Sequence, residues 1–135
     1  MVEPPRRDAP ALSPEQRRAF REGWKRRAEE HAKRLQELAA EARTKSAVAA
    51  KHLRQHCGVK RVLLFGSLAR GDFRADSDID LCVDTLPPHL FYAVYAELER
   101  IVAPFDLDLL VLEDLNRPEH HELRAVILRE GMELP

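Results

Sequence analysis

The stretch "FGSLARGDFRADSDIDLCV", Phe65–Val83, decides the fold because it joins two predicted strands through a glycine turn and a group of carboxylates. The apolar run that ends at Phe65 predicts a buried strand over 59–65. In Asp78–Val83, apolar and polar residues alternate, which predicts a second strand with one buried face. Asp78 and Asp80 share the opposite face of that strand.

Beyond this stretch the pattern continues with a helix, a strand and a helix. A proline pair precedes a predicted helix over 89–102, and "FDLDLLVL" predicts a third strand over 105–112. Pro118 opens a last helix, which we expect to end near Gly131. This order predicts an α/β layer around a three-stranded core.

Toward the N-terminus, the sequence predicts a long helix over 14–56. Ser13 is the expected N-cap, and Gln16 completes a capping box with it. Residues 1–13 are rich in proline and are predicted to be disordered. One apolar stripe follows the helix at spacings of three, four or seven, and its members are Phe20, Trp24, Ala28, Leu35, Leu38, Ala42, Ala49 and Leu53.

The length of this helix leaves two alternatives. A helix over 14–56 is roughly 60 Å long, whereas a domain of about 80 residues is only about 25 Å across. Either the helix breaks near Thr44–Ser46 and folds back as a hairpin, or its first half extends beyond the domain. In the second case we expect residues 14–45 to contact another chain, which would be a second copy or a different protein.

The aspartates predict a metal site. Asp78 and Asp80 lie two residues apart on a strand, so their charges repel unless a cation lies between them. Oxygen ligands of this kind suit Mg²⁺. The third strand adds Asp106 and Asp108 on one face, and either could complete a site for one or two ions; alternation alone does not separate them.

The glycine turn at Gly66 and Ser67 predicts a phosphate-binding site beside the aspartates. Backbone N–H groups at Gly66 and Ser67 would point outward from a strand-to-helix junction and could bind phosphate oxygens. Arg70 and Arg74 would add positive charge nearby. A triphosphate held at this turn beside metal-binding carboxylates would be equipped for nucleotidyl transfer.

Composition narrows the class of protein further. The chain has 135 residues and a net charge of −1, but residues 1–60 carry 15 basic and 8 acidic side chains, whereas 61–135 carry 7 and 15. A basic half can indicate nucleic-acid contact, yet its only aromatic residues are Phe20 and Trp24, a poor platform for stacking bases. No apolar run reaches membrane length, and Cys57 and Cys82 fit neither a metal-binding spacing nor a disulfide framework. We therefore expect a cytoplasmic protein without membrane or nucleic-acid partners.

These residues resemble a known family. "GSLARGDFRADSDIDL" is similar to the Gly-Ser-x10-Asp-x-Asp signature of the nucleotidyltransferases related to DNA polymerase beta, and within them to the minimal nucleotidyltransferases, or MNT domain. "LDLLVLEDL" resembles the strand of the third carboxylate, with Asp108 at the metal-ligating position, and "LRAVILREGMEL" resembles the last helix. The resemblance covers roughly 50–134 and implies a small mixed β-sheet flanked by helices, with the long N-terminal helix as an extension.

The resemblance also implies a function. Asp78, Asp80 and Asp108 would be catalytic and bind Mg²⁺, with ATP held at Gly66 and Ser67. Many minimal nucleotidyltransferases are antitoxins of HEPN-domain proteins, and some transfer AMP to a tyrosine of that toxin. The alternatives are an antitoxin that acts by binding alone, or a nucleotidyltransferase for a small molecule or RNA. The expected division is a tail over 1–13, a helical segment over 14–56 and the catalytic domain over 57–135.

Overall fold

The computed structural model describes residues 11–135, which form two units, 11–34 and Leu35–Pro135. Most of the predicted N-terminal tail lies outside the described residues; residues 11–13 have no regular secondary structure. The first helix, α1 (Pro14–His56), begins where the sequence predicts. The Ser13 N–H donates to Gln16 Oε1 at 2.8 Å, and the Gln16 N–H donates to Ser13 Oγ at 3.1 Å. This reciprocal pair is the predicted capping box.

The second unit is built on a four-stranded mixed sheet. Its strands are β1 (Val62–Phe65), β2 (Ile79–Val83), β3 (Leu107–Val111) and β4 (Met132–Glu133), in the order β3-β2-β1-β4. β2 and β3 are parallel, whereas β1 is antiparallel to both β2 and β4. The expected mixed sheet is therefore confirmed. The three-strand prediction missed β4, which is only two residues long.

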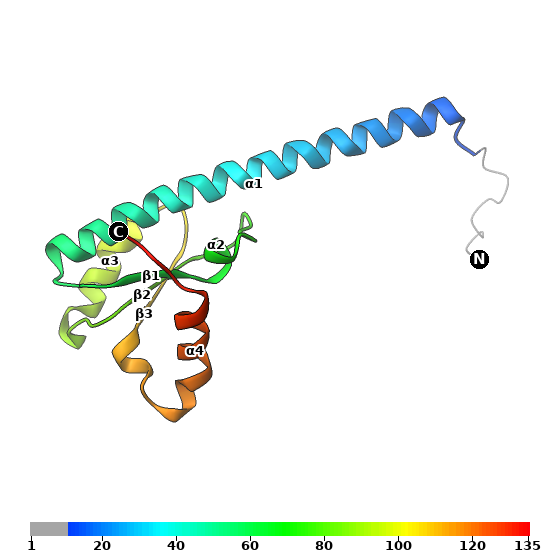
Figure 1. The fold of residues 1–135 in the computed structure, drawn as a ribbon. Helices are drawn as coiled ribbons and strands as arrows, with labels where there is room; N and C mark the ends of the chain where they lie inside the picture. The colour runs from blue at the N-terminus through cyan, green and yellow to red at the C-terminus, as the bar shows by residue number, and fades with distance from the viewer. Residues whose placement is uncertain (1–10) are drawn as a thin grey trace, which may run out of the picture. The chain divides into compact units, whose positions relative to one another are not determined.

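Helices cover both faces of the sheet (Figure 1). On the first face, the residues of α1 from Leu35 onward and α3 (Phe91–Val102) pack over the buried apolar residues of β1, β2 and β3. On the second face, α4 (His121–Glu130) and the short helix η2 (Leu112–Leu115) cover a smaller cluster that includes Cys82 and Ile127. Strands β1 and β2 contribute apolar side chains to both clusters, because successive side chains of a strand point to opposite faces of the sheet.

In the second unit, α1 passes through Thr44–Ser46 without a break, so of the two alternatives the hairpin is excluded. Its small side chains explain how it packs closely on the sheet: Ala42, Ala49 and Ala50 are fully buried. The Ser46 hydroxyl, also buried, donates to the Ala42 carbonyl at 2.7 Å and is thereby satisfied within the helix. The polar residues that suggested a break are thus compatible with a continuous helix.

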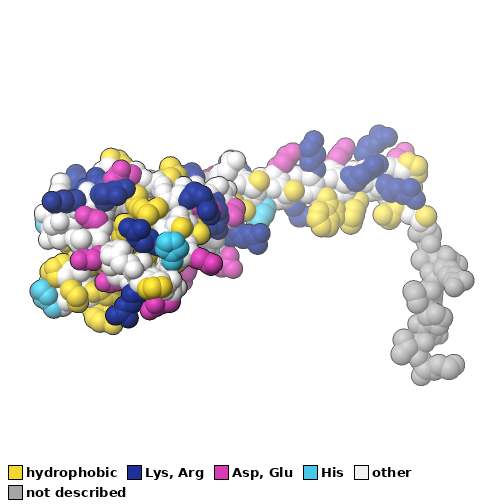
Figure 2. All heavy atoms as spheres, turned by 60° about the horizontal axis from the view of Figure 1, so that its bottom comes forward, with side chains coloured by type: hydrophobic (Ala, Val, Ile, Leu, Met, Phe, Trp, Pro, Cys, Tyr) yellow, Lys and Arg dark blue, Asp and Glu magenta, His cyan; other side chains and the backbone are white. Residues whose placement is uncertain are grey.

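In the first unit, apolar side chains remain exposed. Phe20 and Trp24 keep 58% and 60% of their surface accessible, and the Arg27 guanidinium lies 5.7 Å from the centre of the Trp24 ring. Figure 2 shows hydrophobic side chains along one side of this segment and charged ones along the other. Among residues 11–135, no helix has the length and apolarity that crossing a bilayer requires.

Candidate active site

The sheet places two of the predicted aspartates side by side on neighbouring strands. In the parallel pairing of β2 with β3, Asp80 lies opposite Asp108, and in the antiparallel pairing of β1 with β2 it lies opposite Phe65. Residues opposite one another project from the same face, so both carboxylates lie on the second face of the sheet, near the start of their strands. Neighbouring strands are about 5 Å apart, which holds the two charges close together.

Electrostatics link Asp78 to the same group. Burial first, and then the negative charges of Asp108 and Asp78, raise the pKa of Asp80 from 3.8 to about 6, while Arg70 opposes the shift. Asp106 does not contribute to this shift, and its backbone carbonyl accepts the Ile79 N–H at 2.8 Å, one step before the strand begins. The register therefore favours Asp108 over Asp106 as the third member of the carboxylate group.

The glycine turn lies directly against Asp80. Gly66 follows Phe65, the strand partner of Asp80, and has a φ of +73°, a conformation that favours glycine. A Cβ at this position would overlap the Asp80 carboxylate. Both the backbone conformation and the available space therefore require glycine here. Half-buried Ser67 comes next, in the short helix α2 (Gly66–Arg70), so the turn and the carboxylates form one continuous site.

The two predicted arginines differ in their surroundings. Arg70 lies close enough to lower the pKa of Asp80, and its guanidinium also pairs with Asp72 at 3.5 Å and with Glu130 of α4 at 3.8 Å. Arg74 is exposed in the loop between α2 and β2, where its backbone N–H donates to Ser77 Oγ at 2.9 Å. The structure thus brings Arg70 to the carboxylates and leaves Arg74 on the adjoining loop.

Tyr95 of α3 is a neighbour of the site that the sequence did not reveal. Its hydroxyl donates to the Leu107 carbonyl at 2.8 Å, and Leu107 directly precedes Asp108. Burial raises the pKa of Tyr95, followed by the charges of Glu99 and Asp108 and smaller effects of other aspartates. No motif marks this tyrosine, because its position depends on how α3 packs against β3.

The donor set fits a hard cation. Asp78, Asp80 and Asp108 offer only carboxylate oxygens, and Asp78 and Asp108 are exposed, which leaves room for water ligands. Mg²⁺ prefers such oxygen ligands together with several waters. Repulsion by Asp108 and Asp78, which adds to burial in raising the pKa of Asp80, would be relieved by a bound cation.

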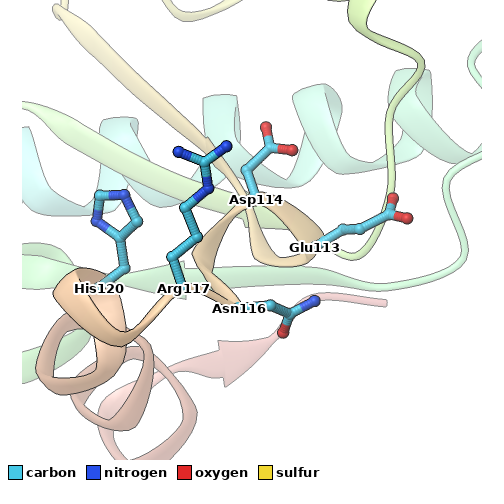
Figure 3. Close-up of a pocket in the computed structure, with 5 residues that line it drawn as sticks. All are labelled: Glu113, Asp114, Asn116, Arg117 and His120. Carbon is cyan, nitrogen blue, oxygen red and sulfur yellow. The ribbon is translucent and has the colours of Figure 1, made fainter.

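A separate pocket of about 460 Å³ lies beyond the opposite end of β3 (Figure 3). It is lined by Glu113, Asp114, Asn116, Arg117 and His120, which come from η2, the following loop and the short helix η3 (Pro118–His120). None of the predicted site residues lines it. Its lining mixes both charge signs, so we assign the candidate active site to the carboxylates rather than to this pocket.

The raised pKa of Asp80 predicts a pH-dependent stability for the metal-free protein. The folded state holds the Asp80 proton more tightly than the unfolded state does, so protonation of Asp80 favours folding. The free energy of unfolding of the metal-free protein should therefore fall as the pH rises from about 4 to about 6. Asp80→Asn should remove this penalty and stabilise the protein by about 1–2 kcal/mol at pH 7.5, after allowance for solvent screening, with little gain at pH 4.

Urea unfolding with a chelator present, at both pH values, measures this effect. Asp76→Asn is the matched control, since Asp76 is exposed on the nearby loop. An equal gain for Asp80→Asn at pH 4 and pH 7.5 would contradict the electrostatic explanation.

Comparison with known proteins bears on the family and the fold of residues 49–134. Residues 49–134 match the family model described as polymerase beta, nucleotidyltransferase. The solved structure of a protein described as a minimal nucleotidyltransferase is 31% identical to this chain, with a TM-score of 0.50, and the match covers 73% of this chain and 93% of that protein. A toxin–antitoxin structure with AMP-PNP is 25% identical, with a TM-score of 0.55 over 67% and 72% of the two chains. A mutant of the toxin–antitoxin MntA–HpeT shares the fold at 23% identity, TM-score 0.52, over 64% and 68%. A search of curated proteins finds no match.

Proposed function

The chain belongs to the polymerase beta nucleotidyltransferase family, and we propose that it transfers AMP from ATP to a protein, as the antitoxin of a toxin–antitoxin pair. The observation that carries this proposal is the placement of Asp80 opposite Asp108, with Gly66 packed against the Asp80 carboxylate. One of the similar toxin–antitoxin structures was solved with AMP-PNP, which supports an adenine nucleotide as the substrate.

We assign the metal to Asp78, Asp80 and Asp108, which would hold Mg²⁺, with two ions expected. When bound, the metal would neutralise negative charge on the phosphates and orient them for displacement. The chain's own contribution is to fix two of these carboxylates on adjacent strands of a sheet, where β2 and β3 cannot shift relative to one another without breaking their backbone hydrogen bonds.

The nucleotide would lie over the glycine turn. Without a side chain at Gly66, the phosphates can approach the backbone beside Asp80, and the Ser67 hydroxyl can donate to a phosphate oxygen. Arg70 would keep its ion pair with Glu130 or turn toward the phosphates, since its side chain is 47% exposed. Arg74, also exposed, could reach the outer phosphates from its loop.

In the transfer step, a hydroxyl oxygen of the acceptor would attack the α-phosphorus of ATP. The new O–P bond forms as the bond to the bridging oxygen breaks, diphosphate leaves, and the hydroxyl proton passes to a base. Asp108 is the carboxylate that we assign to receive this proton, because it is exposed, whereas Asp80 is half-buried. A tyrosine of a HEPN-domain toxin is the acceptor that the family resemblance implies.

Ser67→Ala should weaken ATP binding about tenfold or more. The change removes one hydrogen bond to a charged group, which contributes about 1.5–3 kcal/mol. Calorimetric titration of ATP with Mg²⁺ present measures the effect. Thr85→Ala removes an exposed hydroxyl away from the glycine turn and should leave the affinity unchanged. Unchanged ATP affinity in Ser67→Ala would show that this hydroxyl does not contact the phosphates.

A toxin partner is supported by the two toxin–antitoxin structures among the similar proteins. We propose that residues 14–45 contribute to assembly, with the partner or with a second copy. The exposed aromatic residues Phe20 and Trp24 are the strongest candidates, because exposed apolar patches of this kind mark interfaces. A truncation that removes Phe20 and Trp24 should end at Arg34, because Ala42 is already part of the buried core of the second unit.

The double substitution Phe20→Gln and Trp24→Gln should weaken assembly at least about tenfold while leaving ATP binding intact. Glutamine keeps the helix propensity, so the loss would come from the apolar surface. Light scattering of the full-length protein, alone and with its partner, measures assembly. Val48→Gln is the control, because Val48 is 51% exposed on the same helix within the second unit. Unchanged assembly in the double variant would remove this segment from the interface.

A further inference from the structure

Three metal-binding side chains of different chemistry meet at the end of α1, away from the aspartates. They are His52 in the last turns of α1, Cys57 directly after it, and Glu97 in α3. One ligand atom from each lies within 4.8 Å of the other two. None of the three belongs to the carboxylate site, which lies on the other face of the sheet. We propose that His52, Cys57 and Glu97 form a zinc site that ties the end of α1 to α3.

The spacing is close to that of a zinc centre. Ligand atoms about 2.0–2.3 Å from a tetrahedral Zn²⁺ lie about 3.3–3.8 Å apart. His52 Nε2 and Glu97 Oε2 are already 2.7 Å apart, so a bound ion would separate them slightly and draw the Cys57 sulfur inward. Nitrogen, thiolate and carboxylate donors together suit Zn²⁺ and do not suit Mg²⁺, which prefers oxygen alone.

A contact between His52 and Glu97 alone would account for the placement of these two residues but not for that of Cys57. Burial together with the Glu97 charge raises the pKa of Cys57, so without a cation the thiol stays protonated beside Glu97. A zinc ion reverses this, because it binds the thiolate and releases the proton. Cys57 lies at the C-terminal end of α1, where its N–H donates to the Leu53 carbonyl at 3.1 Å. The C-terminus of a helix favours positive charge, so this position also favours a bound cation.

The surroundings leave room for the ion and a fourth ligand. A pocket of about 370 Å³ opens beside two of the three ligands, His52 and Glu97, and Arg100 and Ile101 complete its lining. Three protein ligands and one water are a common zinc arrangement. Arg100 is the cation in this lining that would oppose the ion, but its side chain is exposed and can turn to solvent. The ring of His56 lies 5.0 Å from that of His52, outside the three-residue group.

Titration of the full-length, tag-free protein with Zn²⁺, in competition with a chromophoric chelator, tests the site. We expect one tight zinc per chain. Zinc affinity should fall by at least about 10–100-fold in each of the ligand variants Cys57→Ser, His52→Gln and Glu97→Gln. Losses of this size already follow from changing residues that only hydrogen-bond to metal ligands. His56→Gln and Asp80→Asn should retain wild-type affinity, the first as a neighbouring imidazole and the second to separate this site from the carboxylates.

Two further measurements keep the test independent of folding defects in the variants. Co²⁺ bound to the wild-type protein should show a thiolate-to-metal charge-transfer band, which Cys57→Ser should lack. Zinc at about 100 times the wild-type Kd should raise the wild-type Tm by about 10 °C, and should raise that of Cys57→Ser by no more than about half as much. AMP transfer should be unaffected by Cys57→Ser. Absence of the band, equal zinc affinity in Cys57→Ser, or a loss in His56→Gln as large as in Cys57→Ser would overturn the proposed ligand set.

Discussion

Asp80→Asn should reduce the rate of AMP transfer at least about 1,000-fold while the protein stays folded. Asp80 is the half-buried member of the carboxylate group, with Asp108 opposite it on β3 and Gly66 against its oxygens. An amide in its place carries no negative charge, so the proposed metal site loses its central ligand. A bound metal contributes several kcal/mol to charge stabilisation in such reactions, and each 1.4 kcal/mol corresponds to about a tenfold change in rate.

Single-turnover transfer with excess Mg²⁺ measures the rate, and the urea midpoint at pH 7.5 shows whether the variant is folded. Asp76→Asn is the matched control, because Asp76 is an exposed aspartate two residues before Asp78 and is expected to retain wild-type transfer. Transfer by Asp80→Asn within tenfold of the wild-type rate would contradict the assignment of this carboxylate.

Gly66→Val should abolish ATP binding, with a loss of at least about 100-fold in affinity. The substitution forces a β-branched residue to a φ of +73° and drives its side chain into the Asp80 carboxylate. The left-handed conformation alone costs about 1–2 kcal/mol. Displacement of Asp80 adds to this, and the valine methyls would occupy the space that the phosphates need.

Gly71→Ala separates these causes. Gly71 also has a positive φ, +91°, but a Cβ there meets no atom within 4 Å. Gly71→Ala should therefore lower the free energy of unfolding by about 1 kcal/mol and leave ATP affinity within about twofold of wild type. ATP binding by calorimetry and Tm on both variants decide the matter. Similar affinities for Gly66→Val and the wild type would place the nucleotide elsewhere.

Much of the fold follows from local patterns in the sequence. Alternation along 78–83 and 105–112 predicted β2 and β3 to within two residues, and the Ser13–Gln16 capping box predicted the start of α1. Alternation also predicts that Asp78 and Asp80 project from one face. It could not separate Asp106 from Asp108, since that choice depends on the register between β2 and β3, which is a tertiary property.

The remaining features depend on packing that no local pattern records. β4 has two residues and exists because the chain after Gly131 returns to β1, with Met132 opposite Leu64. The continuity of α1 at Ser46 depends on burial of alanines against the sheet, which outweighs the weaker helix propensity of the polar residues. The meeting of His52, Cys57 and Glu97 requires α1 and α3 to lie on the same face, and no sequence spacing indicates it.

The measurement that tests the proposed function most directly is the intact mass of the partner protein after incubation with this chain, ATP and Mg²⁺. We predict that the wild-type chain adds AMP to the partner, that fragmentation places it on a tyrosine, and that Asp80→Asn adds none while still forming the complex. A partner that binds the ATP-loaded wild-type chain and yet gains no mass would contradict protein adenylylation, and would leave an antitoxin acting by binding or an enzyme with a different acceptor.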